Sequence, residues 1–127
     1  MIKVIGLLTR RVGLSHDEFV DYYESVHANL GAGYLAGRCA GYRRKFLTPL
    51  TTGTPQTSAM PGVDAILEMW FDDDEQLRST MAFLAQPAIA EAIASDEERV
   101  FDRAKTRFFI ADERVSDLSA LPRHDGG

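Results

Sequence analysis

Apolar and polar residues follow one another along the chain in a way that predicts four β-strands. Residues 2–9 are rich in Ile, Val and Leu and precede the loop-like residues 10–13, as in a strand that runs into a loop. Alternation at 40–47 and 64–71 predicts two further strands, each with one side turned toward a core. A last strand is expected at 105–112.

The faces of the middle strands differ in composition. One face of 64–71 carries Ile66 and Trp70 together with acidic residues, so it is mixed. The other face is wholly apolar and is expected to meet the helices. It consists of Ala65, Leu67, Met69 and Phe71.

A first helix is expected over 15–29. Ser15 followed by Glu18 three residues later is a capping-box pattern that marks a helix start. Gly31 and Gly33 predict its end and a glycine-rich turn before the second strand.

One side of this predicted helix is apolar. At about 100° per residue, His27 falls at the border of the apolar sector and Ala28 falls on the opposite, polar side. A border position suits a group that touches both a pocket and water. The sector itself contains Phe19, Tyr22, Tyr23, Val26 and Leu30.

The second half of the chain predicts further helices and a long loop. Three prolines and several small polar residues at 48–62 predict the loop. Three aspartates at 72–74 offer N-caps for a helix that ends before Pro87. A short alanine-rich helix is expected at 88–94, with one more capped turn from 95–98.

The order of elements, βαββαβ, predicts an α+β, ferredoxin-like fold in which helices cover one face of a four-stranded antiparallel sheet. We expect one domain over 1–114 and a polar tail over 115–127. The mixed face with Ile66 and Trp70 would stay uncovered in a single subunit. Packing two such faces together would remove apolar area from water, so a homodimer is expected.

Composition narrows the class of protein. The chain has 127 residues, 45% of them hydrophobic, which suits one compact domain. A net charge of −5 argues against nucleic-acid binding. No apolar run is long enough for a membrane span, and Met1 opens directly into a strand-like segment without a signal-peptide layout, so a cytoplasmic protein is expected.

Cofactor signatures are missing from the sequence. Cys39 is the single cysteine, which excludes an intrachain disulfide and argues against a cysteine-based metal cluster. The three histidines lack metal-ligand spacing, and the glycines form no dinucleotide fingerprint. We therefore expect no metal and no cofactor.

Several stretches resemble the EthD-type proteins of the dimeric α/β-barrel superfamily. The resemblance runs from Met1 to about Asp112, and its most specific part is Phe19-x-x-Tyr22-Tyr23-x-x-x-His27. It continues in the opening strand into Arg10, Gly13 to Ser15, Gly41-Tyr42, the segment from Asp64 to Phe71, and Asp96 with Phe101.

This resemblance implies a ferredoxin-like subunit, pairing into a dimeric α/β barrel, and a pocket between sheet and helices in each subunit. Members of the superfamily include proteins linked to ether degradation, fungal polyketide dehydratases, muconolactone-type isomerases and cofactor-free monooxygenases. Family membership therefore narrows the fold more than the reaction.

His27 is the strongest candidate for chemistry, because an imidazole can take up or release a proton near neutral pH. The alternative is a border histidine bonded to a helix-end carbonyl. Tyr42, on the inward side of its strand, could donate to a carbonyl or enolate oxygen, or could simply pack. Arg44 on the same face could hold a carboxylate, or could be exposed on an edge strand.

The remaining candidates would bind substrate. Tyr23 is expected to pack with a secondary role in lining a pocket, and Leu67, Met69 and Phe83 are expected to form its walls or the core. Asp96 could orient His27, although a role as a helix N-cap would explain it without function.

Three functions follow as alternatives. The first is a cofactor-independent enzyme that dehydrates or isomerises an apolar or aromatic oxygenated compound with His27 as acid and base. The second is cofactor-free oxygenation of an electron-rich aromatic compound, which anaerobic assay would separate from the first. The third is a non-catalytic accessory or binding protein in an ether or aromatic degradation pathway.

Overall fold

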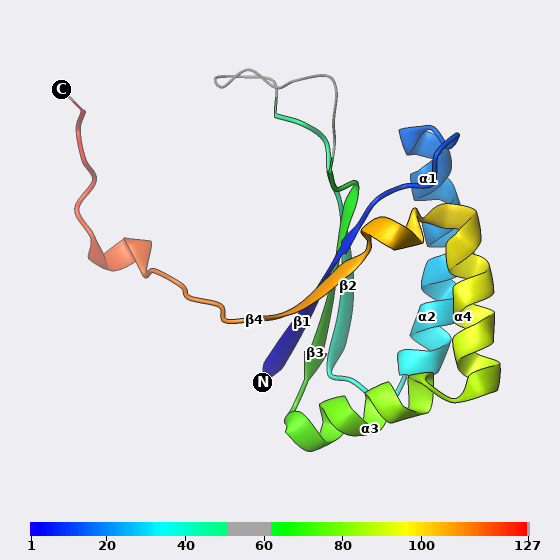
Figure 1. Ribbon diagram of the computed structural model, residues 1–127. Helices are drawn as coiled ribbons and strands as arrows, with labels where there is room; N and C mark the ends of the chain where they lie inside the picture. The colour runs from blue at the N-terminus through cyan, green and yellow to red at the C-terminus, as the bar shows by residue number, and fades with distance from the viewer. Residues whose placement is uncertain (51–61, 127) are drawn as a thin grey trace.

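The computed structural model describes residues 1–50 and 62–126 and has the predicted ferredoxin-like α+β fold (Figure 1). Most of the predicted loop at 48–62 lies outside the described residues. The elements are β1 (Ile2–Leu8), α1 (His16–Tyr22), the π-helical segment η1 (Tyr23–His27), α2 (Ala28–Leu35), β2 (Gly41–Phe46), β3 (Ala65–Phe71), α3 (Asp74–Leu84), α4 (Pro87–Val100) and β4 (Arg107–Ala111), with short 3₁₀ turns at Arg103–Lys105 and Leu118–Ala120.

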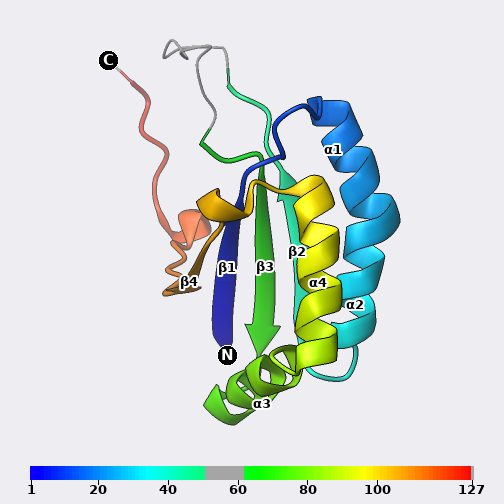
Figure 2. The same ribbon diagram turned by 45° about the vertical axis from the view of Figure 1, so that its right-hand side comes forward.

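The four strands form one antiparallel sheet in the order β2-β3-β1-β4. The central strands β1 and β3 pair along their full lengths, from Ile2 opposite Phe71 to Leu8 opposite Ala65. Helices α1, α2 and α4 lie on one side of the sheet, and α3 crosses at its end (Figures 1 and 2). The predicted sheet with helices on one face is confirmed.

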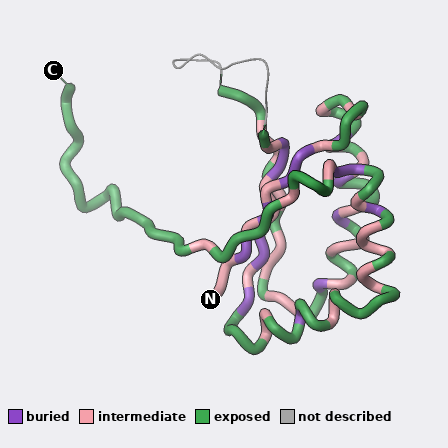
Figure 3. The backbone as a smooth tube through the Cα atoms, viewed as in Figure 1, coloured by how far each residue is buried: buried purple, intermediate pink, exposed green. Residues whose placement is uncertain are grey.

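Side chains between sheet and helices form two core clusters. The predicted inward face of β3 is confirmed, because Ala65, Met69 and Phe71 are buried and Leu67 packs against both clusters. Figure 3 shows buried positions along the strands and on the helices opposite them. The first cluster contains Leu8, Phe19, Tyr23, Ala28, Ala65, Val100 and Phe101, and the second contains Val4, Leu35, Met69 and Phe71.

The predicted end of the first helix was wrong. The helical run continues through Gly31 and Gly33 to Leu35, and the chain turns at Gly37, whose φ is +76°. A glycine inside a helix costs only about 1 kcal/mol relative to alanine. Burying a leucine contributes about 1.5–3 kcal/mol, so the packing of Leu35, 6% exposed, favours another turn.

The π-helical segment η1 also changes which residues face the core. Val26, predicted on the apolar side, is 42% exposed, whereas Ala28, predicted on the polar side, is 4% exposed. In η1 the Ala28 N–H donates to the Tyr23 carbonyl five residues earlier. This wider turn contains about one residue more than a turn of α-helix. The residues that follow it therefore point to other faces than they would in a regular α-helix.

The predicted break before Ser95 was wrong too, because α4 is a single helix from Pro87 to Val100. Proline occupies its first turn, where no intrahelical N–H is needed. Asp96 therefore lies inside a helix and is not an N-cap, and it is 8% exposed. A buried carboxyl in a helix interior needs partners from neighbouring elements.

The sheet face turned away from the helices, here called the outer face, is mixed as expected. Glu68 is 4% exposed and accepts a hydrogen bond from Lys45 at 2.5 Å, while Lys3 lies 3.2 Å from its second oxygen. Lys45 chiefly, then Lys3, hold the pKa of Glu68 below its usual range. The outer face carries Lys3, Ile5, Arg43, Lys45, Ile66, Glu68 and Trp70.

Beyond β4 the chain leaves the sheet as an extended arm, residues 112–126, which projects from the body (Figure 1). Val115, Leu118 and Leu121 on this arm are largely exposed. Among the described residues, no helix has the length and apolar character required to cross a membrane.

Candidate functional site

The candidate site is built around a buried carboxylate that joins two helical elements. Nδ1 of His27, in η1, lies 2.8 Å from Oδ2 of Asp96 in α4. The hydroxyl of Tyr22, at the end of α1, donates to Oδ1 of the same carboxylate at 2.5 Å. The side chains of His27 and Asp96 are 12% and 10% exposed, so water screens this pair only weakly.

The bond to Asp96 defines what the imidazole can do. A carboxylate oxygen accepts hydrogen bonds, so the geometry fits the His27 tautomer that carries its proton on Nδ1. Nε2 then has its lone pair free, and the only side-chain hydrogen bond of His27 to the described residues is the one through Nδ1. A base needs such an unoccupied nitrogen.

Aromatic rings enclose the imidazole. Tyr23 and Phe101 meet the ring of His27 edge-on, with centroids 5.4 and 5.0 Å away. Phe101 follows α4 directly and is fixed by its bridge to Arg10, at the end of the chain segment that leaves β1. His27 thus has the aromatic rings of Tyr23 and Phe101 as neighbours, and the Asp96 carboxylate at Nδ1.

Glu97, next to Asp96, is a second carboxyl in this region that the sequence analysis did not single out. Its pKa is raised by burial, and the neighbouring His27 and Arg103 oppose that rise. The Arg103 guanidinium lies 3.9 Å away, beyond hydrogen-bond distance. Glu97 therefore holds its proton more readily than an exposed glutamate does.

Two phenols lie between the helices and the sheet. The hydroxyl of Tyr23 is buried and has no hydrogen-bond partner among the described residues. Burial, and secondly the adjacent Tyr42, raise the pKa of Tyr23. Burial also raises the pKa of Tyr42, although Tyr23 and Arg44 act in the opposite direction. Both phenols therefore remain protonated donors.

The guanidinium of Arg44 is not free to bind a substrate carboxylate. Its Nε and NH2 donate to the two oxygens of Glu24 at 2.8 and 2.9 Å, a bidentate pair that links β2 to η1. The guanidinium also lies 5.0 Å from the centre of the Tyr42 ring. This ion pair lowers the pKa of Glu24 and fixes the edge strand against the helix.

The structure separates the predicted substrate-binding residues into different places. Leu67 and Met69 lie in the core beside Tyr42. The ring of Phe83, in α3, instead lies 3.5 Å from the guanidinium of Arg38 and meets the ring of Tyr34 edge-on, with centroids 6.3 Å apart. Phe83 is therefore grouped with the end of the helical run and not with His27.

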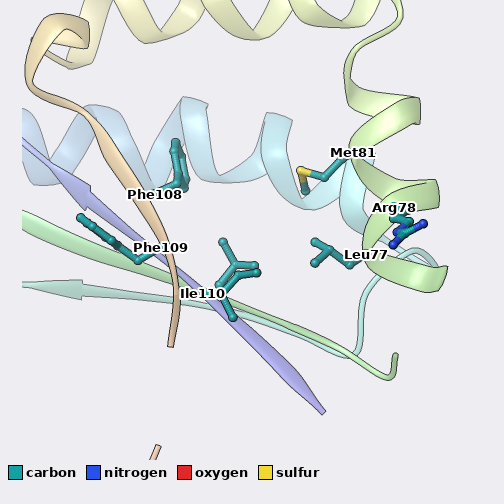
Figure 4. Close-up of a pocket in the computed structure, with 7 residues that line it drawn as sticks. Leu77, Arg78, Met81, Phe108, Phe109 and Ile110 are labelled. Atoms are coloured by element: carbon teal, nitrogen blue, oxygen red, sulfur yellow. The ribbon is translucent and has the colours of Figure 1, made fainter. Parts of the chain in front are cut away.

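A hollow of about 470 Å³ opens between β4 and α3 (Figure 4). Phe108 and Ile110 approach it from β4, and Leu77 and Met81 from α3. Val4, which also lines it, packs in the same core cluster as Met69. No pattern in the sequence indicates this hollow, because its residues belong to elements far apart in the chain.

Metal and thiol chemistry have little support in the described ranges. No group of three His, Cys, Asp or Glu side chains there could hold a metal ion. Cys39 is partly buried, its pKa is raised by burial, and its thiol donates to the Gly41 carbonyl at 3.5 Å. A raised pKa leaves less thiolate and makes the sulfur less reactive.

With a ferredoxin-like fold and a buried His–Asp pair established, the comparisons identify the family. The model of the EthD domain matches residues 11–104, so the chain belongs to the EthD domain family. A search of curated protein sequences finds no significant match.

Solved structures share the fold at low sequence identity. An EthD family protein from Bacillus halodurans is 18% identical with a TM-score of 0.61, covering 90% of this chain and 99% of its own. An EthD-like protein from Ralstonia eutropha is 20% identical with a TM-score of 0.55, covering 98% and 96%. An Arabidopsis thaliana protein is 15% identical with a TM-score of 0.60, covering 93% and 100%. At these identities the similarity establishes the fold alone.

Proposed function

We propose that the protein is a cofactor-independent enzyme that moves protons on an apolar or aromatic oxygenated compound, with His27 as the acid and base. The observation that carries this proposal is the 2.8 Å contact between Nδ1 of His27 and the buried Asp96 carboxylate, which leaves Nε2 without a hydrogen bond to any described residue. A fixed carboxylate orients an imidazole and stabilises the imidazolium that forms when it accepts a proton.

The reaction divides into two proton transfers. Nε2 of His27 removes a proton from a carbon next to a carbonyl, and the electron pair of the broken C–H bond moves onto the carbonyl oxygen. Tyr42, a protonated phenol, would donate to that oxygen. The imidazolium then returns the proton, either to another carbon, giving isomerisation, or to a departing hydroxyl, giving water and a double bond.

The class of substrate follows from what surrounds the base. The rings of Tyr23 and Phe101 border the imidazole, and Leu67 and Met69 line the sheet beside Tyr42. Such surroundings favour a mostly apolar compound with few polar groups. Because Glu24 already accepts two hydrogen bonds from the Arg44 guanidinium, Arg44 would not bind a substrate carboxylate.

Hydrogen–deuterium exchange tests the first transfer without knowledge of the natural substrate. Aryl ketones with acidic C–H bonds are incubated with the protein in D₂O, and loss of the C–H signal is followed by ¹H NMR. The wild-type protein should accelerate exchange for at least one compound of the panel, and His27→Gln should not. If a compound is consumed only when oxygen is present, the oxygenation alternative replaces this proposal.

We also propose that two copies associate through their outer faces. Trp70 and Ile66 on this face would be removed from water in such a pair. The face also carries the cations Lys3, Arg43 and Lys45 around one buried carboxylate, an arrangement that limits which surfaces could pack against it.

A further inference from the structure

We infer that Tyr22 is a positioning residue for His27: its hydroxyl holds one oxygen of Asp96 so that the other faces Nδ1 of the imidazole. The inference rests on the proposed function of His27 as a base. The sequence pattern placed Tyr22 in the apolar sector of the first helix, yet its hydroxyl donates to Oδ1 of Asp96 while Nδ1 of His27 meets Oδ2.

The spacing of the two residues is the first argument. Tyr22 and His27 are five positions apart, and in an α-helix such residues point roughly 140° away from each other. Tyr22 directly precedes η1 and His27 is its last residue; the defining bond of η1 joins the Tyr23 carbonyl to the Ala28 N–H, five residues later. In a π-helical turn, residues five apart lie nearly above one another. The π segment thus allows both side chains to reach one carboxylate.

The burial of Asp96 is the second argument. A carboxylate that is only 8% exposed must have its oxygens satisfied by the protein. Each oxygen of Asp96 has one donor, the Tyr22 hydroxyl or the His27 ring. Burial chiefly, and then the bond to Asp96, raise the pKa of Tyr22 against the opposing effect of Arg99, so the phenol stays protonated and keeps donating.

The consequence concerns the tautomer of His27. With Oδ1 occupied, the carboxylate cannot rotate freely, and Oδ2 stays directed at the Nδ1 proton. This arrangement keeps the proton on Nδ1 and the lone pair on Nε2, the nitrogen that would take the substrate proton. Without the phenol, the carboxylate can turn, and the imidazole can adopt the other tautomer or another ring orientation.

The experiment compares Tyr22→Phe with the wild-type full chain by ¹⁵N NMR of the histidine side chains, at a pH where imidazole is neutral. The variant removes one oxygen and keeps the ring. Tyr34→Phe, which removes a phenol from the same helical run without a bond to Asp96, is the matched control. The wild type should show His27 protonated on Nδ1 only, with a slowly exchanging proton. In Tyr22→Phe the exchange of that proton should accelerate by at least about fivefold, the effect of losing one hydrogen bond, and a second tautomer should appear.

Asp96→Asn provides a second variant in case Tyr22→Phe folds poorly, and it should abolish the preference for one tautomer. A Tyr22→Phe spectrum identical to those of wild type and Tyr34→Phe would overturn the inference, as would a wild-type His27 protonated on Nε2. The proposed function can fail independently of this inference. It fails if His27→Gln leaves the rate of ketone exchange unchanged while Tyr22→Phe still changes the tautomer of His27.

Discussion

At the scale of single residues, two neighbouring carboxyls in α4 have opposite surroundings. Asp96 is satisfied by Tyr22 and His27, whereas Glu97 is partly buried with its nearest cation 3.9 Å away. The difference follows from the side of the helix that each residue occupies. Only the first carboxyl has a hydrogen-bond partner for each of its two oxygens.

Replacement of Glu97 by glutamine should stabilise the protein at pH 7. Burial raises the folded-state pKa of Glu97, so the stability it contributes is present below its unfolded pKa and is lost as pH rises through the folded value. The amide of the variant carries no charge to bury. Thermal unfolding should show a higher melting temperature for the variant at pH 7 and little difference near pH 4. Glu98→Gln, on the exposed side of α4, is the control and should change little.

Glu68→Gln should have the reverse effect. Lys45 and Lys3 lower the folded-state pKa of Glu68, so its contribution is present above the unfolded pKa and is lost as pH falls through the folded value. The variant should unfold more easily at pH 7 and lose part of the acid sensitivity of the wild type. Denaturant titrations between about pH 3 and 7 would measure this, with the exposed Asp112→Asn as comparison. A variant as stable as wild type at pH 7 would contradict the assignment.

The candidate site could be predicted only in part from the sequence. His27 and Asp96 were singled out, and the structure brings them together. The bond of Tyr22 to Asp96 was not predicted and Glu97 was not singled out, because both depend on a π-helical turn or on the continuity of α4. The five-residue separation of Tyr22 and His27 was visible in the sequence, but it has meaning only when the helix departs from about 3.6 residues per turn.

At the scale of elements, strands were easier to predict than helix ends. The inward face of β3 followed directly from alternation, which has a fixed period of two. Where a helix ends depends on free energies of about 1 kcal/mol, such as the cost of having Gly31 inside a helix. Tertiary packing can contribute more than this. Val26 and Ala28 were assigned to the wrong faces of the helix for a similar reason, because no local sequence pattern predicts the π-helical segment η1.

The start of α1 was predicted correctly and permits a quantitative test. Ser15 Oγ accepts from the Glu18 N–H at 3.1 Å, and the Glu18 carboxylate accepts from the Ser15 N–H at 2.9 Å. Ser15→Ala should lower the free energy of unfolding by about 1 kcal/mol, the usual value of such a cap. Ser79→Ala, at an exposed position inside α3, should leave it nearly unchanged or raise it slightly. Equal effects of the two substitutions would argue against the capping box.

At the scale of the whole molecule, a single chain exposes more surface than its mass requires. Its accessible area is 8805 Å², against about 6,700 Å² for a compact monomer of 14.1 kDa. The extended arm, on which Val115, Leu118 and Leu121 are largely exposed, contributes to this excess.

The proposed dimer predicts a mass near twice 14.1 kDa in dilute solution. Trp70→Glu would place a charge on the outer face and should shift the protein toward the monomer. Val12→Glu, at a loop position that is 87% exposed, adds the same charge elsewhere and should leave the mass unchanged. Analytical ultracentrifugation distinguishes these results, and a wild-type monomer at micromolar concentration would rule out the dimer.

The central claim, that His27 transfers protons, is tested most directly by the rate of ketone exchange per folded molecule in His27→Gln. His16→Gln, in the first turn of α1, is the matched control. The account predicts that His27→Gln lowers the catalysed rate by about 10²–10⁴-fold, the contribution of a positioned acid or base, while His16→Gln retains it. Wild-type rates in a His27→Gln protein that remains folded would contradict the account.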